Sequence, residues 1–207
     1  MHNHFRALIG FAFALLLAVP SPIGPAWAEA SPDTVIRSFY DTLASTMKQG
    51  KVLGFTGRYS AMAPAVETAF DLPTMARLSV GPQWSKLGPD QQRRLIDSFS
   101  RFSITNYAAQ FADFNGQRFD VGKTDPQNDG DVIVESMLVP NDGDAVSLNY
   151  RMRRSGENWK IIDVYLNGTI SQLASRRSEY TAVLDKDGLD SLIAAIDAKS
   201  KALANNP

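Results

Sequence analysis

Apolar residues in the first third of the chain recur with the period of helices. One stripe repeats about every four positions over residues 31–49, and Gly50 is expected to end that helix. Weaker helical patterns cover residues 55–70, with Pro64 as a candidate break, and residues 71–80. We therefore expect three amphipathic helices before residue 81.

The longest helical pattern starts at Gly88 and carries the heaviest apolar load of the chain. Large side chains line one stripe of it: Leu95, Ile96, Phe99, Phe102, Tyr107, Phe111 and Phe114. We expect this helix to continue until Gly116 ends it. Such a stripe fits either a filled core or the wall of an apolar pocket.

After Gly116 the pattern changes to the period of two that is typical of strands. It predicts about four antiparallel strands near residues 119–121, 132–139, 148–154 and 159–166. In the third strand Leu148, Tyr150 and Met152 alternate with polar side chains, which predicts one apolar and one wet face. The fourth strand has apolar residues on both faces, so its inward face stays undecided.

Two more amphipathic helices are predicted, over about 170–184 and 189–203. Helices followed by a strand meander and further helices predict an α+β fold, in which an about four-stranded antiparallel sheet is wrapped by helices. This layout is similar to NTF2-like or cystatin-like cones. Such a cone can enclose an internal apolar pocket between its two layers.

Residues 1–28 have the order of a secretory signal: Arg6, an apolar run over residues 7–19, and Ala26-Trp27-Ala28. The apolar run is too short to span a bilayer. We predict cleavage after Ala28 and one domain over residues 29–207. An uncleaved membrane anchor is the alternative.

The composition excludes several classes of enzyme. The chain has no Cys, and its only His residues, His2 and His4, lie in the predicted signal. The remaining domain therefore cannot form a Ser-His-Asp or Cys-His nucleophile system, a redox dithiol or a zinc site with the usual ligands. Its 20 basic and 22 acidic side chains give it no general attraction to nucleic acid. We expect neither a metal nor a cofactor.

Several short motifs resemble those of the MlaC-type lipid-binding proteins, also called the toluene-tolerance family. They are WKIIDV at 159–164, NGTIS at 167–171 and the segment 176–180, with GPQW at 81–84 and NYA at 106–108 upstream. Their order resembles in particular the HpnM branch, which is associated with hopanoid biosynthesis. The resemblance implies a non-catalytic periplasmic carrier that binds phospholipid or hopanoid in an internal pocket. Its implied partners are a membrane-associated ABC-transporter complex with its substrate-binding components, and transiently the membrane.

The resemblance and the apolar pattern together suggest site residues. For the pocket we expect nine residues: Phe99, Phe102, Tyr107, Phe111, Leu148, Tyr150, Met152, Ile161 and Ile170. Two basic pairs are candidate contacts for a head group, a partner or an anionic membrane: Arg153 with Arg154, and Arg176 with Arg177. A solvated strand face and helix surface is the ordinary interpretation of the same arginines.

Asp163 leaves an alternative open, because it is an acid inside an apolar run. A buried carboxylate is costly unless it is paired, so Asp163 should meet an Arg or backbone donors, or else point to the pocket mouth. At the mouth it would suit a ketosteroid-isomerase-like enzyme, with Tyr107, Tyr150 or Tyr165 nearby, although no second carboxylate completes that set. A non-catalytic docking module with a filled core is the other alternative.

Overall fold

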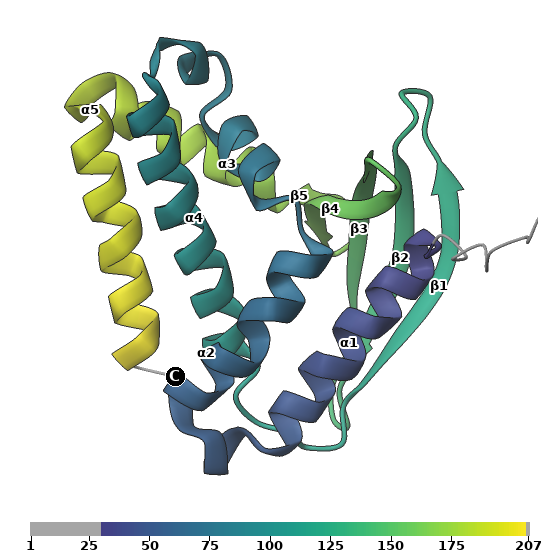
Figure 1. Ribbon diagram of the computed structural model, residues 1–207. Coiled ribbons are helices and arrows are strands. Elements are labelled where there is room, and N and C mark those ends of the chain that lie inside the picture. The colour runs from purple at the N-terminus through teal and green to yellow at the C-terminus, as the bar shows by residue number, and fades with distance from the viewer. Residues whose placement is uncertain (1–29, 206–207) are drawn as a thin grey trace, which may run out of the picture.

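The computed structural model describes residues 30–205, so the predicted signal lies outside the described residues. A layer of helices covers one face of an antiparallel sheet (Figure 1). The helices are α1 (Pro32–Lys48), α2 (Gly50–Ala69), α3 (Leu72–Val80), the 3-10 helix η1 (Gly81–Lys86), α4 (Pro89–Gln110) and α5 (Gln172–Asn205). The predicted α+β class is confirmed.

The sheet is a meander in which each strand pairs with the next one in sequence. Its strands are β1 (Arg118–Pro126), β2 (Val132–Val139), β3 (Val146–Ser155), β4 (Asn158–Leu166) and β5 (Ile170–Ser171). The sheet has five strands rather than about four, because the two-residue β5 pairs with the end of β4. This short edge strand leads directly into α5.

The sheet has an inner face toward the helices and an outer face away from them. On β3 the predicted alternation holds, with Tyr150 and Met152 buried on the inner face and Arg151 on the outer face. A bulge in the β3–β4 pairing shifts the register, so that Tyr150 pairs with Val164 while Met152 pairs with Ile161. Residues 161 and 164 therefore both face inward, which strict alternation would forbid.

Helix α1 lies across the inner face of β1 and β2 (Figure 1). Its apolar stripe is buried, as the four-residue period predicts, with Phe39 and Leu43 almost inaccessible to solvent. The Tyr40 ring stacks on Phe119 of β1 at 4.5 Å, and its hydroxyl bonds to Ser136 of β2 at 2.6 Å. These contacts fix one half of the helical layer to the sheet.

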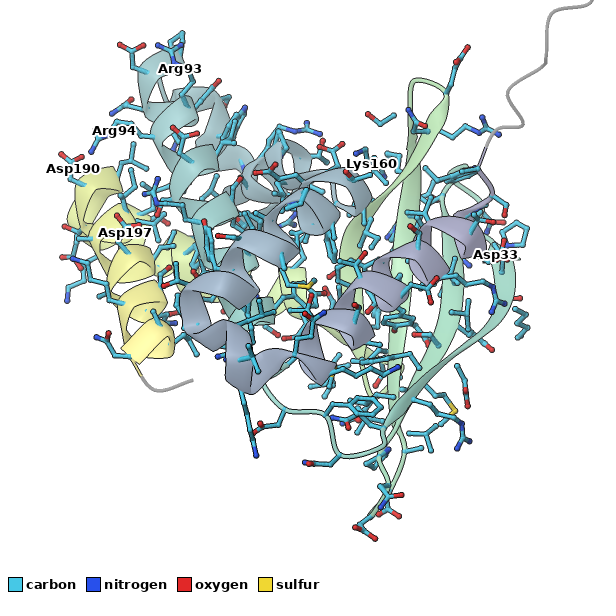
Figure 2. The ribbon with its side chains drawn as sticks, turned by 60° about the horizontal axis from the view of Figure 1, so that its bottom comes forward. Asp33, Arg93, Arg94, Lys160, Asp190 and Asp197 are labelled. Atoms are coloured by element: carbon cyan, nitrogen blue, oxygen red, sulfur yellow. The ribbon has the colours of Figure 1, made fainter. Side chains whose placement is uncertain are left out.

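Helix α4 runs beside the second half of α5, and exposed ion pairs join the two (Figure 2). Arg94 lies 2.6 Å from Asp190, and Arg101 lies 3.1 Å from Asp197. Exposed pairs of this kind contribute at most about 1 kcal/mol each. Burial of Leu192 and Ile196 therefore holds α5 in place more than the charges do.

Two expectations for the helices were wrong, and a third was met. Helix α4 ends at Gln110 rather than near Gly116, so Phe114 leaves the stripe and lies in an exposed segment below Lys48. The break in the second helix is at Gly54, whose φ of 59° requires a glycine-like backbone, whereas Pro64 lies within the helix. The predicted division of the last helical stretch into two helices is confirmed, because Gly188, with a φ of 79°, interrupts α5 just before Leu189.

Strand β1 is longer than predicted, and its second half lacks the expected apolar alternation. It continues through exposed Lys123 to Pro126 as an edge strand, which does not require apolar residues. None of the helices formed by residues 30–205 is long and apolar enough to cross a membrane.

Candidate binding cavity

A cavity of about 180 Å³ lies between the C-terminal half of α4, the inner face of β3 and β4, and the start of α5. Its lining is mostly apolar: Phe70, Met75, Tyr107, Phe111, Leu148, Tyr150, Val164, Leu166 and Leu173. Polar groups come from Ser103, Asn106, Gln110, Gln172 and Arg176. The cavity is thus an apolar chamber with a polar side.

The periodicities of the secondary structure place these side chains. On α4, Ser103, Tyr107 and Gln110 are three and four residues apart and therefore project from one face toward the sheet. On β3, Leu148 and Tyr150 are two residues apart on the inner face. The cavity therefore occupies the space where the helical layer and the sheet fail to meet.

Aromatic rings form one wall of the cavity around Tyr107. This ring stacks on Phe111 at 5.8 Å and meets Phe70 at 5.5 Å and Phe39 at 5.1 Å. Burial raises the pKa of the Tyr107 and Tyr150 hydroxyls well above the usual range. Both tyrosines are therefore neutral at physiological pH, and the wall carries no charge.

Arg176 is the only charged residue among the described residues that line the cavity. Its guanidinium lies over the ring of Phe102 at 4.6 Å and over that of Phe99 at 5.7 Å. These distances are in the range of cation–π contacts. The aromatic stripe of α4 thus contributes a support for this cation as well as a part of the core.

The volume indicates what the cavity can hold. A single water needs only roughly 10–15 Å³, so the cavity has room for more than one group of this size. A methylene is close to water in size. The cavity can therefore accommodate part of a lipid's hydrocarbon.

The nine residues expected for the pocket lie in three places. Four of them line the cavity: Tyr107, Phe111, Leu148 and Tyr150. Four others are buried in the core beside it: Phe99, Phe102, Met152 and Ile161. Ile170, on β5, is 49% exposed and faces away from the core.

Several lining residues were not foreseen from the sequence. The helical spacing of Ser103 and Gln110 to Tyr107 places them on the same face, but an apolar stripe gives no reason to expect polar lining residues. Phe70 reaches the cavity through an isolated bridge to Ile161 of β4, next to the hydrogen bond from Asp71 N–H to the Ile161 carbonyl at 2.9 Å. No local sequence pattern predicts a contact between residues so far apart in the chain.

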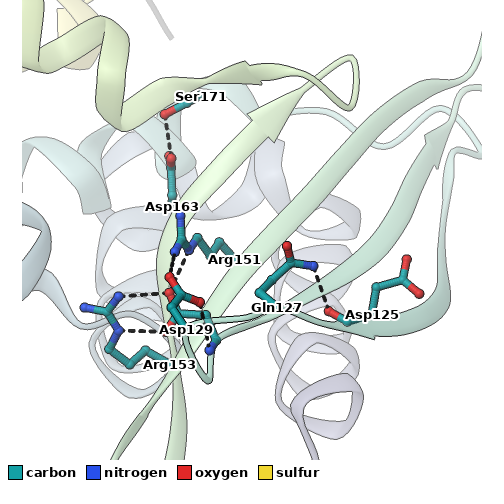
Figure 3. A network of polar contacts seen from close by, with 8 residues as sticks. Asp125, Gln127, Asp129, Arg151, Arg153, Asp163 and Ser171 are labelled. Atoms are coloured by element: carbon teal, nitrogen blue, oxygen red, sulfur yellow. Dashed lines mark hydrogen bonds and ion pairs between the residues drawn. The ribbon is translucent and has the colours of Figure 1, made fainter.

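Arg151 and Arg153 of the β3–β4 hairpin lie on the outer face, away from the cavity. Arg151 and Arg153 both bind Asp131, with N–O distances of 2.7 Å, and Arg151 also binds Asp129 (Figure 3). We call Asp129, Asp131, Arg151 and Arg153 the outer-face network. Arg154 lies over the Trp159 ring at 5.0 Å.

Arg176 and Arg177 of α5 point to different surroundings. Arg177 is exposed and donates its Nε–H to the Leu78 carbonyl of α3 at 2.7 Å, whereas Arg176 lines the cavity. Two adjacent residues on a helix differ by 100° in direction, so a basic pair cannot serve one surface. The sequence pair thus divides into a surface arginine and a cavity arginine.

Asp163 is buried on the outer side of β4 and does not line the cavity. Its carboxylate accepts hydrogen bonds from the backbone N–H of Val164 at 2.7 Å and of Leu173 at 3.0 Å, and from the Ser171 hydroxyl (Figure 3). These bonds satisfy the first turn of α5 as a cap does. The geometry gives Asp163 a structural task and separates it from Tyr107 and Tyr150.

A second recess of about 570 Å³ lies between α1, α2 and the hairpin. Small side chains dominate its lining, with Ala61, Ala65 and Ala69 on α2, and Trp159 at one end. The recess follows from the close approach of two helices with small residues. It contains one charged residue, Lys160, whose ammonium is engaged by the carbonyls of Glu67 and Thr68.

Comparisons with known proteins agree with this architecture. The chain is similar to the structure of a phospholipid-binding protein from Ralstonia solanacearum in complex with a phospholipid, with a TM-score of 0.74 and 23% identity. The match covers 84% of this chain and 99% of that chain, and at this identity it shows a common fold. No curated protein matches the chain significantly. The profile of the MlaC protein matches residues 37–198, and the chain therefore belongs to the MlaC family.

Proposed function

We propose that this protein is a non-catalytic lipid carrier that holds a lipid chain in the cavity between α4 and the sheet. The observation that carries the proposal is the apolar, uncharged wall of that cavity, with one cation at its side. Family membership supports it, as does a common fold with a protein whose structure contains a phospholipid. The described residues that line the cavity include no Asp, Glu, His or Cys.

The energetics fit a carrier that needs help to release its ligand. Burial of hydrocarbon contributes about 0.8 kcal/mol per methylene, so a sixteen-carbon chain gains about 12 kcal/mol by leaving water. Spontaneous release of such a chain is slow. The ligand should therefore leave only when a partner or a membrane offers a continuous apolar path.

The finer parts of the proposal come from the family resemblance. The cargo is phospholipid or hopanoid, the latter if the chain belongs to the HpnM branch. The protein works in the periplasm after removal of residues 1–28, and it exchanges lipid with an ABC-transporter complex and its substrate-binding components. The exposed Arg154 and Arg177 are candidate contacts in that exchange.

Native mass spectrometry of the protein, purified from its own cells, tests the proposal. A discrete added mass that extracts into organic solvent as lipid supports it, and the extract identifies the cargo. A protein without bound lipid, which also fails to take up lipid from vesicles, would overturn it. The uptake experiment with phospholipid vesicles tests binding even when the cells do not supply the lipid.

A further inference from the structure

The charged groups of the cavity wall are of positive sign only. Among its described lining residues there is one cation, Arg176, and no Asp or Glu. The other polar lining groups, such as Asn106 and Gln172, are uncharged amides and hydroxyls. An uncharged ligand would leave this cation beside an apolar chamber without a counter-charge.

The contacts of Arg176 leave part of its hydrogen-bonding capacity available. The central carbon of its guanidinium lies 4.6 Å from the ring centroid of Phe102 and 5.7 Å from that of Phe99. Arg176 also interacts with the Tyr180 hydroxyl, one turn further along α5. A guanidinium has five N–H donors, so one such partner leaves others for a ligand. No carboxylate in residues 30–205 forms an ion pair with Arg176, whereas its neighbour Arg177 is tied to Leu78.

Half-burial strengthens the case for an anion at this position. Arg176 is neither fully exposed nor fully buried, so a charged partner would meet it at the boundary of the chamber. Arginine binds carboxylate and phosphate through two parallel N–H bonds, which are strong at partly desolvated positions. A chain in the chamber would place its head group at this boundary.

We infer that Arg176 binds the oxyanion of the ligand's head group, and that the cavity therefore selects anionic amphiphiles over uncharged ones of equal chain length. This inference rests on the proposed function and names its substrate class. The oxyanion is a phosphodiester or a carboxylate, because both accept the same pair of N–H bonds. An uncharged hopanoid would gain nothing from Arg176.

Three ligands with the same sixteen-carbon chain test the inference. They are 1-palmitoyl lysophosphatidylglycerol with a phosphodiester, palmitate with a carboxylate, and monopalmitoylglycerol with neither. Their affinities are measured below their micelle concentrations with delipidated protein from which residues 1–28 have been removed. We expect at least one anionic ligand to bind about 10- to 100-fold more tightly than monopalmitoylglycerol. Whether the phosphodiester or the carboxylate carries the preference identifies the head group.

Two variants locate the preference. Arg176→Met keeps a flexible side chain beside Phe102 but removes the guanidinium, and it should reduce the ratio of anionic to uncharged affinity to about one. Arg177→Met removes the same charge from the adjacent surface residue and should keep the preference. Equal affinities of the three ligands for the unmodified protein, or a preference that survives Arg176→Met, would overturn the inference alone. Failure of all three ligands to bind would overturn the proposed function with it.

Discussion

The two faces of the sheet use arginine in opposite ways. On the outer face, Arg151 and Arg153 close on Asp131, whose side chain is only 1% exposed. On the inner side, Arg176 lies over the Phe102 ring and borders a chamber whose described lining residues include no carboxylate. In the first arrangement the arginine charges are balanced by carboxylates, and the role is structural. In the second arrangement the cation can meet a charged group of a ligand. The role of an arginine therefore depends more on the group that it contacts in the fold than on whether it belongs to a basic cluster in the sequence.

This difference also explains why one sheet can combine rigidity with an open space. The outer-face network ties the turn before β2 to β3 (Figure 3). The inner face can then remain underpacked beside Tyr107 and Leu148. We expect changes to the outer face to alter stability, and changes to the inner face to alter ligand binding.

The largest expected effect is from filling the chamber. Leu148 on β3 lines it, so Leu148→Trp should place an indole in space that a lipid chain would occupy. We expect lipid occupancy, measured by native mass spectrometry, to fall by more than about tenfold. Met137→Trp is the matched control, because Met137 is 42% exposed on the neighbouring strand β2. Full occupancy in Leu148→Trp would place the lipid elsewhere.

The outer-face network should respond in stability alone. Asp131→Ala leaves two guanidinium groups without their shared carboxylate, and we expect the free energy of unfolding to fall by about 2 kcal/mol. The effect stays below that of a fully buried pair, because the Arg151 and Arg153 side chains are 30% and 43% exposed. Denaturant unfolding measures it.

Asp129→Ala is the control for this variant, since Asp129 contacts the same network from a side chain that is 49% exposed. Its loss should cost less than about 1 kcal/mol. Lipid occupancy should be unchanged in both variants. If Asp131→Ala lost lipid without losing stability, the two faces would not be independent.

A smaller loss is expected at the start of α5. Asp163→Asn keeps one acceptor oxygen but removes the negative charge that holds the Leu173 N–H and the Ser171 hydroxyl. We expect a loss of about 1 kcal/mol in the free energy of unfolding, as for other helix caps, with normal lipid occupancy. Loss of an enzymatic turnover in this variant would instead favour the isomerase-like alternative.

The two faces should also contribute to stability in different pH ranges. Burial opposes ionisation of Asp131, but its hydrogen bonds to Arg153 and Arg151 outweigh this and lower its pKa. Its stabilising contribution is therefore present at neutral pH and is lost as the pH falls below about 3.8. Asp131→Ala should flatten this acid side of the unfolding profile.

The cavity tyrosines affect stability at alkaline pH. Burial raises the pKa of Tyr107 above its value of 10 in the unfolded chain, so neutral Tyr107 stabilises the fold below pH 10 and this contribution is lost as the pH rises. Tyr107→Phe should therefore flatten the alkaline side of the profile of unfolding free energy against pH. An unchanged alkaline slope would show that this ring is not enclosed in solution.

The sequence was sufficient for the elements whose pattern is local. Alternation along β3 correctly separates buried Tyr150 and Met152 from Arg151, because one strand between two different environments obeys a period of two. The same rule fails on β4, where the bulge turns both Ile161 and Val164 inward. A bulge depends on the pairing of two strands, and one strand's sequence does not reveal it.

The candidate site was less predictable, because its residues are defined by contacts between distant segments. The stripe of α4 continues without change from Phe99, which is in the core, to Tyr107, which lines the cavity. Likewise, Arg153 and Arg176 look alike in sequence. They differ because the β2–β3 pairing of Val132 with Met152 brings Asp131 beside Arg153.

Photo-crosslinking tests most directly the central claim that the lipid chain lies between α4 and the sheet. The protein is loaded with a phospholipid that carries a diazirine near the end of one acyl chain, irradiated, digested and sequenced by mass spectrometry. The account predicts adducts on cavity residues such as Tyr107, Leu148 and Leu173. Adducts confined to the recess between α1 and α2, on Pro64 or Trp159, would contradict it.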